Sequence, residues 1–228
     1  MASGLLYGNS VVDLVRRLDA VNRTVLIVRH SERPSFDDVP IQAWDGVGLT
    51  ERGIEGARSF GRALTQDGGI LTMGAYGWGL KRCLDSADAI AAGAKEKGCR
   101  ISGQGTLAFG SPIADRRKYD LALGSGHWEE FVDDWLRGRA QDGALVPADR
   151  YATGFLRELF DRQLPESEGV SLIVTHDLQI YPLVGFLLGI PILKLDFLNG
   201  LIIKTGPRHV RVGFEGTVRL LNRSELLF

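Results

Sequence analysis

The 228-residue chain is poor in cysteine and has almost no charge imbalance, and each shortage argues against a class of protein. Its two cysteines, Cys83 and Cys99, do not form a metal-like pair, and no cluster of cysteine and histidine has metal-ligand spacing. The formal net charge of −1 argues against general electrostatic binding of nucleic acid or of an anionic membrane surface. We therefore expect no metal, no nucleic-acid partner and no membrane partner.

Long apolar runs and targeting segments are also lacking. The longest apolar stretch, near residues 181–191, is broken by Pro182, Gly185 and Gly189 and is too short to span a bilayer. The first six residues lack the basic segment and the long apolar core of a secretory signal. No glycine-rich loop of the P-loop type and no internal repeat occurs. These observations predict a soluble cytoplasmic protein that needs no cofactor.

What the chain does have is two strand-like runs that each end in a histidine. Residues 25–28 are continuously apolar and stop at Arg29 and His30, and residues 170–175 stop at His176. Such runs are typical of strands covered on both faces in a parallel sheet. Ligand sites in these sheets lie just beyond the carboxyl ends of the strands. Because the chain has only four histidines, this pairing predicts one active site.

The residues around these histidines resemble the histidine phosphatase superfamily, which includes phosphoglycerate mutases and acid phosphatases. Four sequence blocks carry the resemblance, and they occur in the family's order. They are Arg29-His30-Ser31, similar to the Arg-His-Gly signature, residues 48–57, similar to the Leu-Thr…Gly helix start, residues 80–87, similar to the second-arginine helix, and residues 174–177, similar to the second-histidine block. The order of all four blocks is far more specific than any one of them.

Two positions depart from the family pattern. Ser31 replaces the usual glycine, which adds a hydroxyl to a tight loop. Trp78 and Gly79 stand where many relatives have serine and proline before the second arginine, so one phosphate contact is expected to be missing. Neither change removes a group that phosphoryl transfer needs.

The resemblance and the pattern of elements predict a three-layer α/β/α sandwich with a mainly parallel sheet, as in phosphoglycerate mutase-like proteins. We expect one domain over residues 1–228, with residues 100–150 as a variable cap insertion over the carboxyl edge of the sheet. In that range we expect a strand near Ile101, followed by an irregular insertion. Helices are expected near residues 11–18, 53–66, 80–92, 128–137, 150–163 and 178–188, and antiparallel strands at 200–204, 209–214 and 218–221 are expected to close one edge.

Phosphoryl transfer needs a deprotonated nucleophile, groups that hold the phosphate charge, and a proton for the leaving oxygen. Imidazole can be a neutral nucleophile near pH 7, and nearby guanidinium groups disfavour its protonation. By resemblance, His30 is the residue that becomes transiently phosphorylated, and His176 adds a donor to the transferring group. We expect Arg29, Arg33 and Arg82 to bind the phosphate oxygens bidentately.

The proton donor has three candidates. Asp177 ranks first, because a His-Asp pair at the second histidine resembles the acid phosphatase branch, in which that aspartate is the acid. The mutase branch takes a glutamate from the loop after the second-arginine helix, where this chain offers Asp115. Glu32 ranks third.

The predicted function is hydrolysis of a small phosphorylated substrate, a phosphomonoester, through a phosphohistidine on His30. One alternative is a phosphoglycerate mutase-like phosphotransferase, and another is a non-catalytic module that binds a phosphorylated ligand. The basic run Arg116-Arg117-Lys118 is either a solvated face or a device that selects anionic substrates. Nothing in the sequence indicates the oligomeric state.

Overall fold

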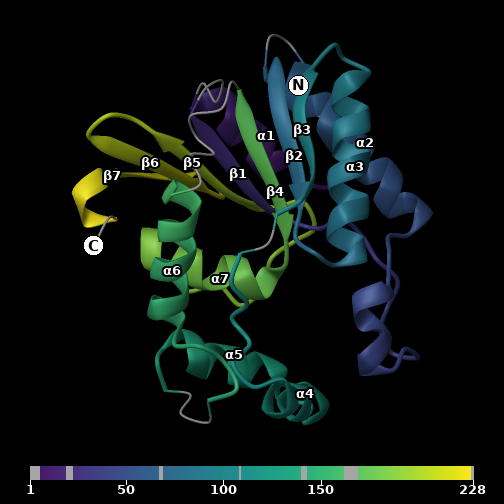
Figure 1. Ribbon diagram of the computed structural model, residues 1–228, viewed down its shortest axis with the longest axis vertical. Helices are drawn as coiled ribbons and strands as arrows, with labels where there is room; N and C mark the ends of the chain where they lie inside the picture. Colours follow the sequence, from purple (N-terminus) through teal and green to yellow (C-terminus); the bar gives the residue numbers. More distant parts are fainter. Residues whose placement is uncertain are drawn as a thin grey trace.

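The computed structural model describes residues 6–18, 23–66, 69–107, 109–139, 143–161 and 169–226 (Figure 1). The first half of these residues contains α1 (Asn9–Arg17), β1 (Thr24–Arg29), the 3-10 helix η1 (Ile41–Gly46), α2 (Glu51–Thr65), β2 (Thr72–Gly77), α3 (Lys81–Lys95) and β3 (Arg100–Thr106). The second half contains α4 (Arg116–Gly124), α5 (Trp128–Leu136), α6 (Ala148–Asp161), β4 (Val170–Thr175), α7 (Asp177–Leu188), β5 (Gly200–Thr205), β6 (His209–Phe214), β7 (Thr217–Asn222) and the 3-10 helix η4 (Arg223–Glu225).

The strands form one seven-stranded sheet in the order β3-β2-β4-β1-β5-β6-β7. β3, β2, β4 and β1 pair in parallel, whereas β5, β6 and β7 add an antiparallel edge. The register of β1 and β4 places Arg29 opposite Thr175. His30 and His176 therefore leave the sheet side by side at its carboxyl edge. The predicted fold class is confirmed, including the antiparallel C-terminal strands.

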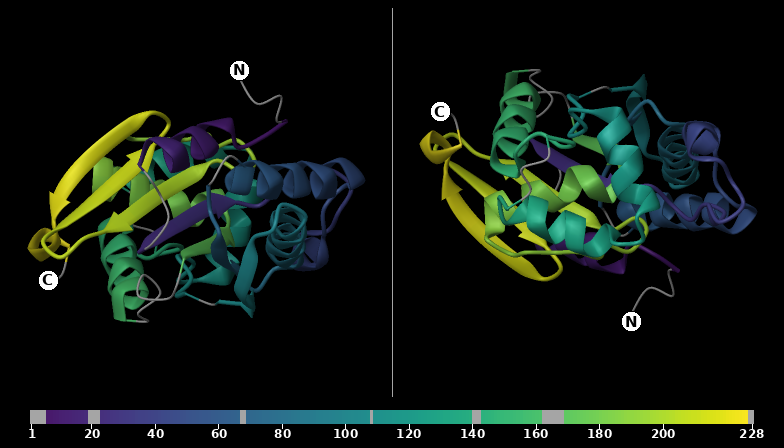
Figure 2. Two further views of the ribbon diagram at one scale, coloured as in Figure 1. Left: turned by 90° about the horizontal axis from the view of Figure 1, so that it is seen from above. Right: turned by 90° about the horizontal axis from the view of Figure 1, so that it is seen from below.

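Both faces of the sheet are buried under helices, which is why β1 is apolar without alternation. Leu26 and Val28 face a core shared with α1, α2 and α3, whereas Val25 and Ile27 face a second core shared with α5, α6 and α7. Figure 2 shows these two helical layers on opposite sides of the strands. All four side chains are fully buried, so β1 cannot shift its register without exposing an apolar face.

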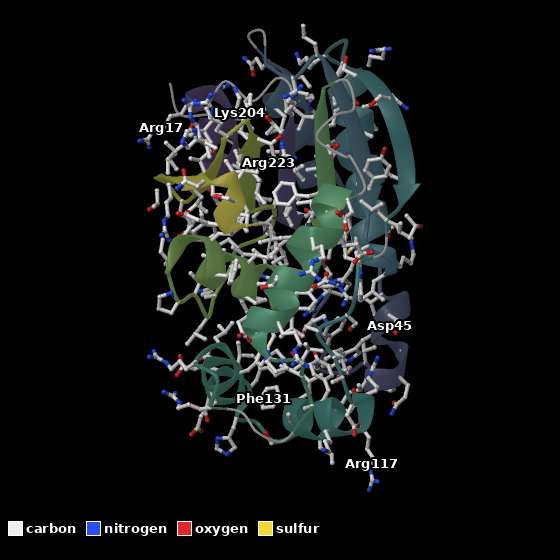
Figure 3. The ribbon with its side chains drawn as sticks, turned by 60° about the vertical axis from the view of Figure 1, so that its left-hand side comes forward. Arg17, Asp45, Arg117, Phe131, Lys204 and Arg223 are labelled. Carbon is white, nitrogen blue, oxygen red and sulfur yellow. The ribbon has the colours of Figure 1, made fainter. Side chains whose placement is uncertain are left out.

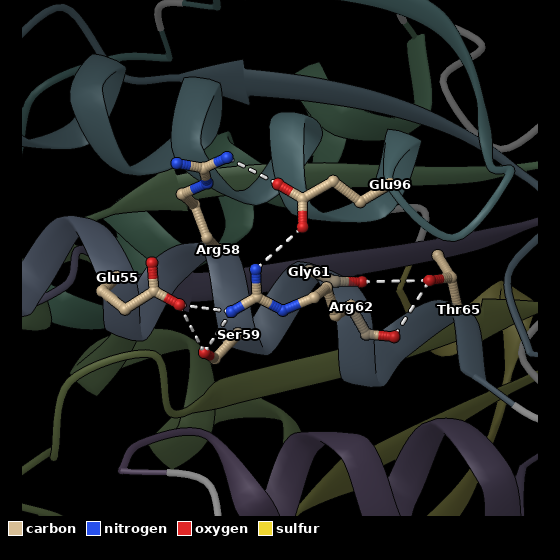
Figure 4. Close-up of polar contacts among 7 residues, drawn as sticks. All are labelled: Glu55, Arg58, Ser59, Gly61, Arg62, Thr65 and Glu96. Atoms are coloured by element: carbon tan, nitrogen blue, oxygen red, sulfur yellow. Dashed lines mark hydrogen bonds and ion pairs between the residues drawn. The ribbon is translucent and has the colours of Figure 1, made fainter.

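Helices α2 and α3 pack closely along the C-terminal half of α3. A Cβ atom on Gly93 would lie 2.0 Å from the carbonyl oxygen of Arg58, so only glycine allows this approach. At the C-terminal end of α3, Glu96 accepts hydrogen bonds from two arginines of α2, from Arg58 at 2.6 Å and from Arg62 at 2.8 Å (Figure 4). The first turn of α3, which carries Arg82, approaches the sheet at Gly77 of β2, where a Cβ atom would lie 2.7 Å from the Leu84 nitrogen.

Several predicted boundaries agree with the structure, and one expectation is wrong. Thr50 caps α2 as predicted, because its hydroxyl accepts a hydrogen bond from the Gly53 amide at 2.9 Å. The expected irregular insertion after β3 instead contains the regular helix α4. Asp115 caps that helix by accepting from the Lys118 amide at 3.1 Å, a local signal that the glycine content of the segment obscured. The predicted helix end at Gln163 lies outside the described residues.

We refer to residues 109–139, which contain α4 and α5, as the cap. In Figure 1, α4 and α5 lie below the sheet, beyond the end to which β1 and β4 point. β3, although within the range expected for the insertion, belongs to the sheet. Among the helices of the described residues, none is long and apolar enough to cross a membrane.

Candidate active site

A cavity of about 610 Å³ lies between the carboxyl edge of the sheet and the cap. Six of the eight predicted site residues line it, and we call these six the basic end of the cavity: Arg29, His30, Arg33, Arg82, His176 and Asp177. They come from β1 and the loop after it, from α3, and from the start of α7. Three guanidinium groups and one carboxylate leave an excess of two positive charges there, which matches a phosphomonoester dianion.

His30 is buried, and its ring is held by its own loop. Its Nδ1 lies 2.7 Å from the carbonyl oxygen of Ser31. A carbonyl only accepts hydrogen bonds, so Nδ1 carries the proton and Nε2 keeps its lone pair. Burial, with smaller contributions from Arg29 and the other arginines, holds the pKa of His30 well below its ordinary value of 6.5. The ring is therefore neutral and has one unprotonated nitrogen, as a nucleophile requires.

His176 lies beside His30, with ring centroids 5.3 Å apart and the planes at 68°. Burial, followed by the charge of Arg82, lowers the pKa of His176 well below 6.5. Its Nε2 lies 3.5 Å from the sulfur of Cys83. Burial raises the pKa of that cysteine, which stays a thiol at neutral pH. Cys83 thus helps to orient the second histidine.

The second arginine is positioned by the segment between β1 and α2. Arg82 is 7 % exposed, and its Nη1 donates a hydrogen bond of 2.7 Å to the backbone oxygen of Trp44. Burial lowers the pKa of Arg82 and that of Arg33, the latter to about 10. Arg33 also lies 3.3 Å above the ring centre of Phe36. Both guanidinium groups remain charged at neutral pH but are partly stripped of water, which strengthens their attraction for an anion.

Asp177 and Arg29 form an ion pair across the ends of β4 and β1. The Oδ2 atom of Asp177 lies 3.2 Å from Nη2 of Arg29, and its Oδ1 accepts from the Leu178 amide at 2.8 Å. The carboxylate is one-third exposed. A bound phosphate would compete with Asp177 for the guanidinium group of Arg29. Ligand binding is therefore coupled to the breaking of this ion pair.

The two other candidate acids do not line the cavity. Asp115 is occupied as the N-cap of α4. Glu32 accepts hydrogen bonds from the hydroxyls of Tyr7 and of Thr50, and Arg52 lies 3.6 Å away. The hydrogen bond from Tyr7 is the main cause that lowers the pKa of Glu32. The structure therefore places Glu32 in a network that anchors the start of α2.

Ser31 fits the tight loop without strain. The described non-glycine residues with positive φ are Arg23, Leu198 and Glu215, so the backbone of Ser31 is ordinary. Its hydroxyl donates to the carbonyl oxygen of Gly53 at 2.7 Å. Its amide donates to the Ser86 hydroxyl at 2.9 Å. The hydroxyl that the sequence adds here ties the loop to α2 instead of crowding it.

Sequence reasoning missed the aromatic part of the site. We call five lining residues the aromatic wall: Phe36, Trp44, Trp78, Tyr119 and Trp128. Phe36 and Trp44 come from the irregular segment after β1, which has no periodicity to reveal them. Trp78 follows β2, and Tyr119 and Trp128 come from α4 and α5 of the cap. Among the five, the sequence singled out only Trp78, as a departure from the family pattern before Arg82.

Phe197 was also missed. Its ring lies 4.7 Å from the Arg29 guanidinium and 5.8 Å from the His30 ring. It follows α7 in a loop, and its residue type alone gave no signal. Among the described residues, no group of three or more histidine, cysteine, aspartate or glutamate side chains is arranged to hold a metal ion.

The sheet order, the helical layers and the paired histidines at the carboxyl edge define a phosphoglycerate mutase-like α/β protein. The family model of the histidine phosphatase superfamily (branch 1) matches residues 25–102. This match confirms the resemblance that the motifs indicated. No curated protein matches the chain in sequence.

Solved structures extend the likeness over most of the chain. Phosphoglycerate mutase from Bacillus anthracis is 17 % identical, with a TM-score of 0.54, and the match covers 92 % of this chain and 96 % of that one. A mycobacterial glucosyl-3-phosphoglycerate phosphatase in complex with VO3 is 13 % identical, with a TM-score of 0.53, and the match covers 86 % and 100 %. At these identities the likeness shows a shared fold.

Proposed function

We propose that the protein is a phosphatase that hydrolyses phosphomonoesters through a phosphohistidine on His30. The observation that carries this proposal is the state of His30: a buried, neutral ring whose Nδ1 is bound to the Ser31 carbonyl, in a cavity lined by Arg29, Arg33 and Arg82. A module that only binds a phosphorylated ligand needs the arginines but has no use for a nucleophile.

In the first step, Nε2 of His30 attacks phosphorus while the bond between phosphorus and the ester oxygen breaks. The arginines and His176 stabilise the charge on the equatorial oxygens. Asp177, which takes up a proton when the phosphate replaces it at Arg29, gives that proton to the leaving oxygen, so an alcohol departs. In the second step, water gives a proton to the Asp177 carboxylate and attacks the phosphohistidine. Inorganic phosphate leaves, and both side chains return to their starting states.

The test is release of phosphate from p-nitrophenyl phosphate, combined with trapping of the intermediate. Wild-type protein quenched during turnover of a radiolabelled substrate should carry acid-labile phosphate on His30. We expect His30→Ala to lower kcat by at least about 10³-fold, because removal of a nucleophile abolishes the covalent route. Its melting temperature should stay near that of the wild type.

The matched control is His209→Ala, because His209 lies exposed on β6, away from the cavity. It should retain full activity. If His30→Ala keeps more than a few per cent of wild-type turnover while folded, another residue is the nucleophile. If label moves to a second position of a sugar-acid phosphate without release of phosphate, the activity is that of a mutase.

A further inference from the structure

The rest of the cavity differs from the basic end. In addition to the aromatic wall, it is lined by the aliphatic side chains of Leu80, Ile113, Leu123 and Leu178, with Asp45, Ser111, Arg116 and Gln179 as its polar residues. The volume of about 610 Å³ is within the range of sites that enclose drug-sized ligands and exceeds the need of a phosphate group alone. The room beyond the basic end is therefore available for the alcohol part of an ester.

The polar atoms of two wall residues are already used. Nε1 of Trp44 donates to the Val39 carbonyl at 2.8 Å, and Nε1 of Trp78 donates to the Phe109 carbonyl at 3.2 Å. The Trp44 ring stacks on Phe36 with centroids 4.2 Å apart and planes at 11°. These residues therefore offer ring carbon to a ligand, and little hydrogen bonding.

The cap contributes one cation to the lining, and this cation is already paired. Nε of Arg116 lies 2.8 Å from Asp120, and its Nη1 lies 3.9 Å from Asp45. Arg117 and Lys118 do not line the cavity, and Arg117 projects from the outer end of the cap (Figure 3). Among the described lining residues outside the basic end, no unpaired cation thus remains for a second phosphate or a carboxylate on the substrate.

We infer that the alcohol released by this enzyme is large and apolar, an aryl or long alkyl alcohol packed against the aromatic wall while its phosphate occupies the basic end. This inference rests on the proposed phosphatase function and names its substrate class. Burial of apolar surface supplies the binding free energy of the alcohol part. The two arginines nearest Phe36, Arg33 and Arg82, hold the phosphate. A phosphorylated sugar acid would place its hydroxyl groups against ring carbon of Phe36, Trp44 and Trp78, which cannot replace their hydrogen bonds to water.

The test compares n-alkyl phosphates, because ethyl, butyl and octyl phosphate have the same chemistry at phosphorus and differ only in apolar length. We expect kcat/KM to rise by up to about fourfold for each added methylene, the value for full burial. Glycerol phosphate and 3-phosphoglycerate should be poorer substrates than octyl phosphate. A flat series, or a preference for either hydrophilic ester, would overturn the inference and leave the phosphatase proposal intact. Failure of the phosphatase proposal appears separately, as no phosphate release from any ester, p-nitrophenyl phosphate included.

Two leucines of α4 supply a matched pair of variants. Leu123 lines the cavity, whereas Leu121 is 66 % exposed and does not. Leu123→Ala should reduce the ratio of kcat/KM for octyl phosphate to that for ethyl phosphate by about fivefold. Leu121→Ala should leave both values unchanged. Equal ratios in the two variants would mean that the alkyl chain does not reach the wall. Inhibition by inorganic phosphate, measured in parallel, verifies that the basic end of each variant is still folded.

Discussion

The two ends of the cavity are built in opposite ways. The basic end stands on strand ends and helix starts, and its residues are fixed by backbone hydrogen bonds such as that from His30 to Ser31. The aromatic wall stands mainly on the segment after β1 and on the cap. Its half-buried rings are held by one another and by hydrogen bonds from Trp44 and Trp78 to backbone carbonyls of the same two regions. In the proposed reaction, strand ends and helix starts position the chemistry, while the cap and the segment after β1 determine which ester fits.

The largest effect expected from disturbing the basic end, His30 apart, concerns Asp177. Asp177→Asn should slow hydrolysis of alkyl phosphates by about 10²- to 10⁴-fold, because an alkoxide needs a proton as it leaves. Hydrolysis of p-nitrophenyl phosphate should change far less, since nitrophenolate leaves without one. Steady-state rates on both esters give the answer.

The matched control is Asp115→Asn, in which asparagine still caps α4. It should treat both esters as the wild type does. If Asp115→Asn slows alkyl phosphates far more than p-nitrophenyl phosphate and Asp177→Asn does not, the proton comes from Asp115 in the cap. The division between the two ends would then be wrong.

The next largest effect tests whether geometry or only charge matters at the basic end. Arg82→Lys keeps the charge but loses the planar pair of donors and the hydrogen bond to Trp44. We expect kcat/KM to fall by about 10²-fold. Arg117→Ala, in the exposed part of the cap, should change it little. Equal losses in both variants would indicate a long-range field in place of a specific contact.

The smallest effect concerns stability and comes from the two neutral imidazoles. In the unfolded chain they bind protons as the pH falls through about 6.5, whereas in the folded protein their pKa values lie well below 6.5. Their neutral forms therefore favour folding at and above pH 7, and this advantage is lost as the pH drops below 6.5. Each histidine reduces the free energy of unfolding by up to about 1.4 kcal/mol per pH unit in that range.

Urea unfolding at pH 8, 7, 6 and 5 measures this slope. The double variant His30→Asn/His176→Asn should show a shallower loss below pH 6.5 than the wild type. His127→Asn/His209→Asn is the control, because both side chains are exposed. Identical slopes for the wild type and the site variant would contradict the assignment of buried neutral rings.

The same contrast explains how much could be predicted from the sequence. β1 and β4 were predictable because burial on both faces makes them continuously apolar, and parallel pairing then brings His30 and His176 together. The N-cap residue of α2, Thr50, was predictable from its type and its neighbours. The aromatic wall was not predictable, because Phe36 and Trp44 lie in an irregular segment whose path depends on distant contacts. The role of Cys83 beside His176 depends on the packing of α3 on the sheet, which no local pattern encodes.

The register between β1 and β4 also has a consequence for how the protein folds. Residues 29 and 175 become neighbours only when the long stretch of chain between them, including β2, β3 and the cap, is closed into a loop. Closing so long a loop is entropically costly, and sheets built from such distant strands form slowly. We therefore expect His30 and His176 to come together late in folding. Regain of activity after dilution from denaturant should therefore trail the regain of helix signal.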